Sequence, residues 1–155
     1  MASIETVDFG SFGKAVQTNI SYTVGPGEKN ERNDVMLIQT LFQLIGMNDT
    51  FSQGLIGLET KDLPEPSGVY DTKTTRAIWG FQRQRPYRLI KPEGKVHPAS
   101  YQNRVLKKGP QARQMMITVL NLTAAQVGQH TDLISAVRKI SPSIVFTAPH
   151  PPKTP

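Results

Sequence analysis

The chain contains no cysteine among its 155 residues. Disulfide bonds, catalysis by a thiol and metal binding through cysteine sulfur are therefore excluded. Long apolar runs are also missing, and no stretch approaches the roughly 20 residues that a helix needs to cross a bilayer. Apolar residues make up 37% of the chain, somewhat less than in an average globular protein, while 12 prolines and 12 glycines favour long loops.

The start of the chain shows no signal peptide. Its first 25 residues include Glu5, Asp8 and Lys14 and never reach an apolar run of seven. We therefore expect a protein that is cytoplasmic, or that is exported to the periplasm or cell wall by a signal-peptide-independent route.

Patterns typical of enzymes are also absent. The sequence lacks the short motifs of serine hydrolases, zinc peptidases and phosphate-binding loops. Its three histidines, His97, His130 and His150, fall in different expected elements without the company of a zinc site. Acidic residues that could form a glycosidase pair, such as Glu28 and Glu59, fall in expected loops. We predict a non-enzyme with no cofactor and no metal.

The length suits one domain with a hydrophobic core plus appendages. We expect an N-terminal arm and loop (1–33), a helical domain (34–109), a C-terminal helical extension (110–141) and a proline-rich tail (142–155).

Apolar residues at helical spacing predict a helix that begins at Asn33 or Asp34 and ends at Ile45. Asp71 is placed to cap a second helix, with Ala77, Ile78 and Phe81 as its buried stripe. Further helices are expected over residues 98–106, 115–122 and, capped by Asp132, 133–140. The expected fold class is all-α: a three-helix bundle with two additional C-terminal helices and a loose N-terminal arm holding at most one short strand.

A glycine turn that leads into a helix occurs twice, in residues 67–74 and again in residues 93–100, and the two copies align without a gap. Gly68 and Gly94 occupy the same position in the two copies. We expect both glycines to adopt backbone angles that a side chain would resist, so that the chain enters the next helix sharply.

These turns and the segment before them resemble the peptidoglycan-binding domain family, over roughly residues 24–106. The family pattern V-x-x-L-Q-x-x-L-x-x-L-G is matched by Val35, Ile38, Gln39, Phe42, Ile45 and Gly46. Its next segments, D-G-x-F-G-x-x-T-x-x-A-V-x-x-F-Q and D-G-x-V-G-P-x-T, are matched by residues 67–82 and 93–100. Departures from the pattern are Ser67 and Glu93 for aspartate, Asp71 and His97 for glycine, Ser100 for threonine, and a lengthened connection over residues 47–66.

Residues 24–35 and 91–98 are similar to a subset of this family that is associated with type VI secretion or cell-wall hydrolases. The resemblance implies a three-helix bundle that binds peptidoglycan, through either its glycan or its stem peptide. The subset implies an effector or secretion-system protein as a further partner.

Positive charge concentrates in the middle of the chain, where residues 73–113 hold 11 basic and 1 acidic side chains. Such a segment attracts anionic partners, and an aromatic ring beside an arginine can stack on a ligand while the guanidinium pairs with a carboxylate. The predicted ligand-binding residues are Tyr70, Arg76, Trp79, Arg83, Tyr87 and Arg88. Two structural alternatives stay open: Trp79 packs under the 47–66 loop, and the arginines form a solvated face.

A different class of function is also open, an adaptor that keeps the fold but binds a protein partner. Its predicted contact surface is Met115, Met116, Val119 and Leu120. Nucleic acid is not expected as a partner, because the sequence has no recognition-helix motif and its basic residues are spread through loops.

Overall fold

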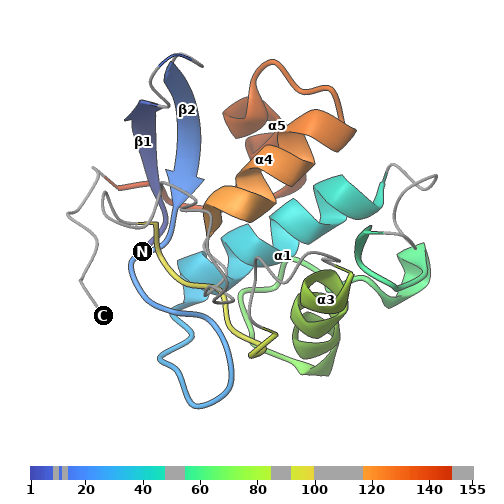
Figure 1. Cartoon of the computed structure of the whole chain (residues 1–155). Helices are drawn as coiled ribbons and strands as arrows, with labels where there is room; N and C mark the ends of the chain where they lie inside the picture. Colours follow the sequence, from blue (N-terminus) through green and yellow to red (C-terminus); the bar gives the residue numbers. More distant parts are fainter. Residues whose placement is uncertain (9–10, 12–13, 48–54, 85–91, 100–116, 148–155) are drawn as a thin grey trace.

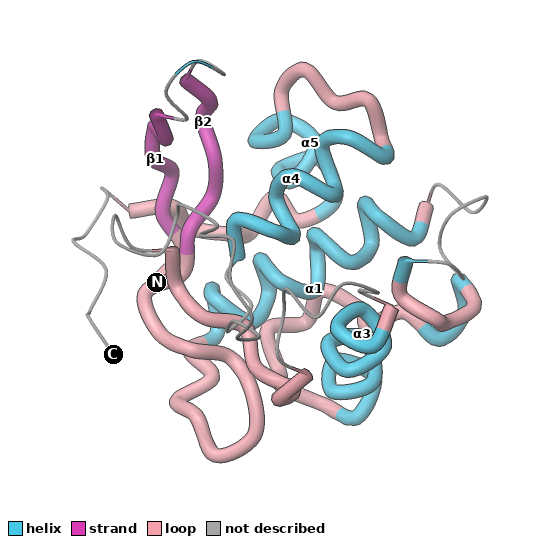
Figure 2. The backbone as a smooth tube through the Cα atoms, in the orientation of Figure 1, coloured by secondary structure: helices cyan, strands magenta, loops and turns pink. Residues whose placement is uncertain are grey.

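The computed structural model describes residues 1–8, 11, 14–47, 55–84, 92–99 and 117–147. In these ranges the chain forms a β-hairpin and four α-helices, with one short 3-10 helix, η2 (Thr60–Asp62). Figures 1 and 2 show helix α1 at the centre, with α4 and α5 on one side, α3 on the other and the hairpin beside α4. The fold is therefore mixed α/β.

The all-α prediction is wrong because the N-terminal segment is a two-stranded antiparallel sheet. Strand β1 (Ser3–Asp8) pairs with β2 (Lys14–Asn19), in a register that runs from Ser3 opposite Asn19 to Asp8 opposite Lys14. Nor is this segment a loose arm, since Ala2, Ile20 and Val24 are buried in the core. The pairing depends on contacts with residues far along the chain, which local patterns do not show.

Helix α1 (Arg32–Gly46) is the central element, and most of its residues are buried, polar Gln39 and Thr40 included. The expected cap at Asn33 or Asp34 is wrong: Glu31 caps the helix by accepting a hydrogen bond from the Asp34 N–H. The Asp34 carboxylate turns inward and accepts bonds from the backbone N–H groups of Ser21 and Tyr22. Burial raises the pKa of Asp34, and these bonds tie the hairpin exit to α1.

Helix α3 (Thr72–Arg83) has the predicted N-cap, since Asp71 accepts a hydrogen bond from the Thr74 N–H at 2.9 Å. Its apolar stripe packs on α1, and the Phe81 ring meets Phe42 edge-on at 6.0 Å between centroids. The predicted stripe of Ala77, Ile78 and Phe81 is fully buried. This packing leaves the opposite face of α3 toward solvent.

Helices α4 (Ile117–Val127) and α5 (Leu133–Ile140) cover the other side of α1. Asp132 caps α5 as predicted, accepting from the Ser135 N–H at 3.1 Å. Of the helix expected over residues 98–106, all but Pro98 and Ala99 lie outside the described residues, and these two are not helical. One buried cluster joins the four helices with residues that flank the hairpin, from Ala2 to Ile144.

Candidate ligand-binding face of helix α3

Both repeated turns have the glycine geometry that the sequence predicts. Gly68 has φ +79° and Gly94 has φ +74°, in the left-handed region that favours glycine. Each turn is also held by a buried glutamine from the preceding helix. Gln39 Oε1 accepts from the Gly68 N–H at 2.9 Å, and Gln82 Oε1 accepts from the Gly94 N–H at 2.8 Å.

The two glutamines complete their clamps with the other end of the amide. Gln39 Nε2 donates to the Val69 carbonyl at 2.9 Å, and Gln82 Nε2 donates to the Lys95 carbonyl at 2.8 Å. The repeat in sequence is therefore a repeat in three dimensions, in which the side-chain amide of a helical glutamine hydrogen-bonds to the backbone of a glycine turn. Sequence reasoning missed this role, although a glutamine stands in both helical segments that carry the family resemblance.

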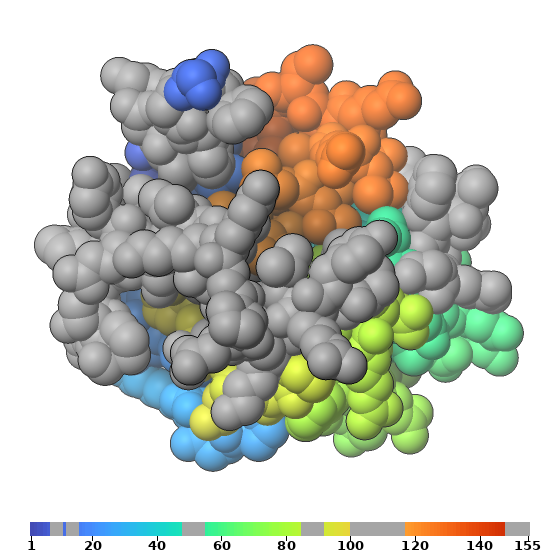
Figure 3. Space-filling model, viewed as in Figure 1, coloured from blue at the N-terminus to red at the C-terminus, as the bar shows by residue number. Residues whose placement is uncertain are grey.

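Trp79 lies between a glycine turn and an arginine. A Cβ placed on Gly94 would lie 2.5 Å from Trp79 Nε1, so only glycine lets this turn approach the indole. On the ring, the Arg83 guanidinium carbon lies 5.3 Å from the centroid, within the range of a cation–π contact. Trp79 is half-buried and Arg83 is exposed. Figure 3 shows the 92–99 turn and α3 meeting at the molecular surface.

Tyr70 lies at the other end of this face. Its hydroxyl accepts a hydrogen bond from Thr75 Oγ1 at 2.8 Å, and its half-buried ring packs against the core. Thr75, Trp79 and Arg83 follow one another at four-residue spacing and so share one side of α3, with exposed Arg76 beside them. The structure thus brings three of the six predicted ligand residues onto one face of α3, with a fourth, Tyr70, bonded to the start of that face. Tyr87 and Arg88 lie outside the described residues.

The sequence leaves open a position of Trp79 under the 47–66 loop, and in the described part of that loop the observed contact is with its neighbour Gly80. A Cβ on Gly80 would lie 2.0 Å from the Ile56 carbonyl oxygen, so the described end of that loop packs on Gly80. Trp79 points to the Gly94 turn, and its indole is left partly open to solvent.

A second contact supports the Gly94 turn from far along the chain. Val24 and Val96 form an isolated antiparallel bridge, with N–H to carbonyl distances of 3.0 and 2.9 Å. Beside it, the Lys95 ammonium lies 2.7 Å from Glu28, a hydrogen bond that raises the pKa of Lys95. The two segments that resemble the secretion-associated subset therefore form one structural unit behind the α3 face.

His97 joins this unit through both ring nitrogens. Its Nδ1 lies 3.1 Å from Thr23 Oγ1, and its Nε2 contacts the Glu93 carboxylate. All three side chains are half-buried. Sequence reasoning missed the trio, because Thr23 lies 74 residues before His97. Since both nitrogens are engaged, the trio fixes the turn on the 23–30 segment.

Of the four residues predicted to contact a protein partner, the structure describes two, Val119 and Leu120. Leu120 is fully buried and Val119 is half-buried against the core, while Met115 and Met116 lie outside the described residues. The exposed apolar side chain of α4 is instead Leu122, at 44% exposure. A helix residue that points away from Leu120 is the one left for solvent.

Within the described residues there is no cluster of three or more histidine or acidic side chains that could hold a metal ion. None of the helices in these same ranges has the length and apolar character of a membrane span.

The chain matches no protein-family model, no curated protein and no solved structure. The resemblance to peptidoglycan-binding domains rests on the residues quoted above, and the function that it implies is a proposal.

Proposed function

We propose that the protein is a non-catalytic module that binds peptidoglycan on the α3 face. The observation that carries the proposal is the arginine–tryptophan pair: Arg83 lies over the partly open Trp79 ring, beside a turn built around Gly94. A face of this kind offers an aromatic surface to a sugar or peptide and a guanidinium to a carboxylate.

The chemistry of peptidoglycan fits this combination. Its glycan presents apolar sugar faces, and its stem peptides carry carboxylates. Arg76 and Arg83 are exposed on the same face, and guanidinium groups pair with carboxylates through two parallel hydrogen bonds. Helix α3 belongs to the strongly cationic sequence segment 73–113, and positive charge raises the local concentration of an anionic polymer.

Sedimentation with isolated peptidoglycan across a salt series tests the proposal. Wild-type protein should pellet with the wall at low salt, and Trp79→Ala and Arg83→Ala should each weaken binding by about tenfold or more, as loss of a stacking or bidentate contact does. The matched control is Arg138→Ala, which removes the same charge and a similar contact, since Arg138 lies 5.5 Å over the Phe146 ring.

Two results would overturn the proposal. One is the absence of any sedimentation by the wild type at low salt. The other is an equal loss in Arg83→Ala and Arg138→Ala, because binding would then follow net charge rather than the α3 face.

The adaptor function gains no support at its predicted surface, because Leu120 is buried there. Export to the periplasm or wall follows from the proposed ligand and is tested by locating the protein in fractionated cells.

A further inference from the structure

Helix α3 carries two exposed arginines on the same side. Arg76 and Arg83 are close to two full helical turns apart, so their side chains leave the helix in nearly the same direction. At a rise of about 1.5 Å per residue, their Cα atoms lie about 10 Å apart along the axis. An extended peptide covers this distance in about three residues. The face therefore has the spacing of two acidic groups on one extended peptide.

The Trp79 ring between these arginines is partly taken up by two neighbours. The Arg83 guanidinium carbon lies 5.3 Å from the ring centroid. The Gly94 turn lies against the indole, where an added Cβ would come within 2.5 Å of Nε1 and 2.7 Å of Cε2. A sugar needs an open aromatic face to stack on. The ring in this position is a better support for Arg83 than a platform for glycan.

The contact with Trp79 leaves the hydrogen-bonding groups of Arg83 in a usable geometry. A guanidinium that stacks on an aromatic ring keeps its N–H groups in its own plane, where they match the two oxygens of a carboxylate. Because the ring already restricts the side chain, less conformational freedom is lost on binding. Arg83 is thus prepared for a carboxylate, whereas a neutral glycan would make no use of its charge.

The chain itself offers few carboxylates to this face. Among the described residues, none lies within ion-pair distance of Arg76 or Arg83. The sequence from 73 to 113 contains one acidic side chain, Glu93, and it contacts His97. Asp49 is the one acidic side chain outside the described residues, and a single carboxylate cannot pair with two arginines about 10 Å apart. A ligand that supplies two carboxylates would complement the face.

We infer that the α3 face recognises the stem peptide of peptidoglycan and not its glycan strand, with Arg76 and Arg83 each pairing with one of two carboxylates on the extended peptide. This inference rests on the proposed function and names the part of the wall polymer that the face holds.

The probe is acetyl-L-Ala-γ-D-Glu-L-Lys-D-Ala-D-Ala, a stem pentapeptide whose glutamate and terminal carboxylates are about three residues apart. Trp79 is the single tryptophan, so its emission reports binding at this face. Titration of the full chain with the pentapeptide should give a saturable change. The same peptide with both carboxylates converted to amides should bind at least about tenfold more weakly. Chitotetraose, a neutral oligomer of N-acetylglucosamine, should leave the emission unchanged.

Arginine variants test the pairing of each carboxylate. Arg76→Gln and Arg83→Gln should each weaken pentapeptide binding by about tenfold. In each variant, amidation of the carboxylate that has lost its arginine should weaken binding by less than about twofold, while amidation of the other should keep its full effect. Arg138→Gln, which removes a charge from α5, should bind like wild type.

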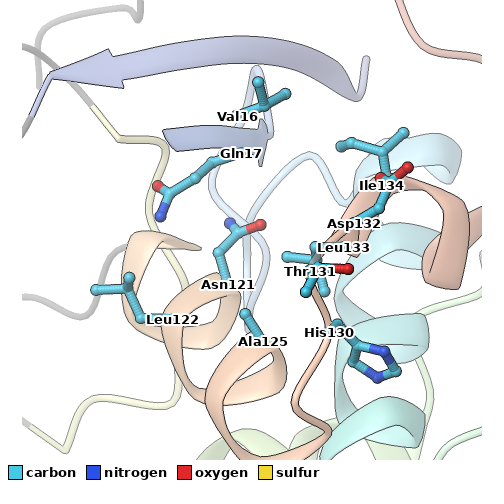
Figure 4. Close-up of a pocket in the computed structure, with 10 residues that line it drawn as sticks. All are labelled: Val16, Gln17, Asn121, Leu122, Ala125, His130, Thr131, Asp132, Leu133 and Ile134. Atoms are coloured by element: carbon cyan, nitrogen blue, oxygen red, sulfur yellow. The ribbon is translucent and has the colours of Figure 1, made fainter. Parts of the chain in front are cut away.

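A pocket of about 580 Å³ between strand β2, helix α4 and the start of α5 is the alternative place for a peptide (Figure 4). It lies on the other side of α1 from α3 (Figure 1). Its lining includes the Asp132 carboxylate, which already accepts hydrogen bonds from Ser135 through both oxygens. Leu122→Ala changes this pocket without touching the α3 face, so it should bind the pentapeptide within about twofold of wild type.

The inference would be overturned by an unchanged Trp79 emission with the pentapeptide, by equal binding of its diamide, or by a loss of binding in Leu122→Ala. Sedimentation with isolated peptidoglycan separates these results from failure of the proposed function. Release of the pelleted protein by the pentapeptide and not by chitotetraose would support both. Release by chitotetraose alone would leave the proposed function standing and overturn the inference.

Discussion

The side-chain amide of Asn121 pairs with both backbone polar groups of Thr18, a residue 103 positions earlier in the chain. It does for strand β2 what a neighbouring strand would do at this position. Asn121 is 1% exposed and makes four hydrogen bonds, two of them to groups that would otherwise be buried without a partner. Asn121 thus links the hairpin to α4 by hydrogen bonds, in addition to the packing of β2 against this helix.

Asn121→Ala should therefore lower the free energy of unfolding by about 3 kcal/mol, because it leaves the Thr18 N–H and carbonyl unsatisfied in the interior. Chemical denaturation followed by circular dichroism measures the loss. Gln126→Ala, an exposed change on the same helix, should stay within about 0.5 kcal/mol of wild type. Equal losses in the two variants would contradict the role assigned to Asn121.

The glutamine clamps predict a second stability effect. Gln39→Leu keeps the side-chain volume but leaves the Gly68 N–H and the Val69 carbonyl without their hydrogen-bond partner. It should lower the free energy of unfolding by about 2–4 kcal/mol, measured by denaturation. Gln43→Leu on the same helix is the control, since half-buried Gln43 donates to one described acceptor, the Pro64 carbonyl, and water can replace this bond. The clamp would be unimportant if Gln39→Leu cost no more than Gln43→Leu.

Gly94→Ala should lower the stability of the fold by more than the strain of its positive φ angle alone would. Gly27 has the same φ, +74°, but a Cβ there meets nothing within 4 Å, so Gly27→Ala should cost about 1–2 kcal/mol. At Gly94 the added carbon also collides with the Trp79 indole. We expect a larger loss of stability and a shifted emission of Trp79, the single tryptophan. Matching losses and an unchanged spectrum would show that the indole does not rest on this turn.

The cap of α5 predicts a pH dependence. The Ser135 hydroxyl, and then its backbone N–H, hold the pKa of Asp132 below its ordinary value of 3.8. The unfolded chain therefore binds the proton more readily, so the stability from this carboxylate is present above pH 3.8 and is lost as pH falls through the lower folded-state pKa.

Asp132→Asn should be less stable than wild type at neutral pH, and the difference should shrink in acid. Thermal unfolding over a pH series measures it. Ser135→Ala, which removes the hydrogen bond from the hydroxyl to Asp132, should reduce the pH dependence that Asp132 contributes. A difference between wild type and Asp132→Asn that grows in acid would have the wrong sign for this cap.

Features that depend on a few neighbouring residues could be predicted from the sequence. Asp71 and Asp132 cap helices as expected, because a carboxylate placed just before a helical stripe reaches the N–H groups of the first turn. The positive φ angles of Gly68 and Gly94 were predictable from their place in a repeated turn.

Features that depend on distant partners could not. Aspartate is a residue type that often caps helices, but the Asp34 carboxylate accepts hydrogen bonds from the backbone at the hairpin exit. Glu31 therefore caps α1 instead. The helical spacing of Leu120 is compatible with an apolar stripe that faces the core or one that faces a partner. Only packing against α1 shows that Leu120 belongs to the core. The predicted ligand face is similar: α3 spacing aligns Trp79 with Arg83, but the Gly94 turn beneath the indole comes from the fold.

The sequence by itself determined the positions of α3 and α5, their caps and the two glycine turns, since helical periodicity, capping and backbone sterics act within a few residues. Only the tertiary structure decided that the N-terminal segment is a hairpin, that Asn121 covers its edge beside Val16, and that segments 24–30 and 94–97 support one turn. The last two arrangements join residues about 70 to 100 positions apart, and their free energy comes from hydrogen bonds and burial that exist only once the chain has folded.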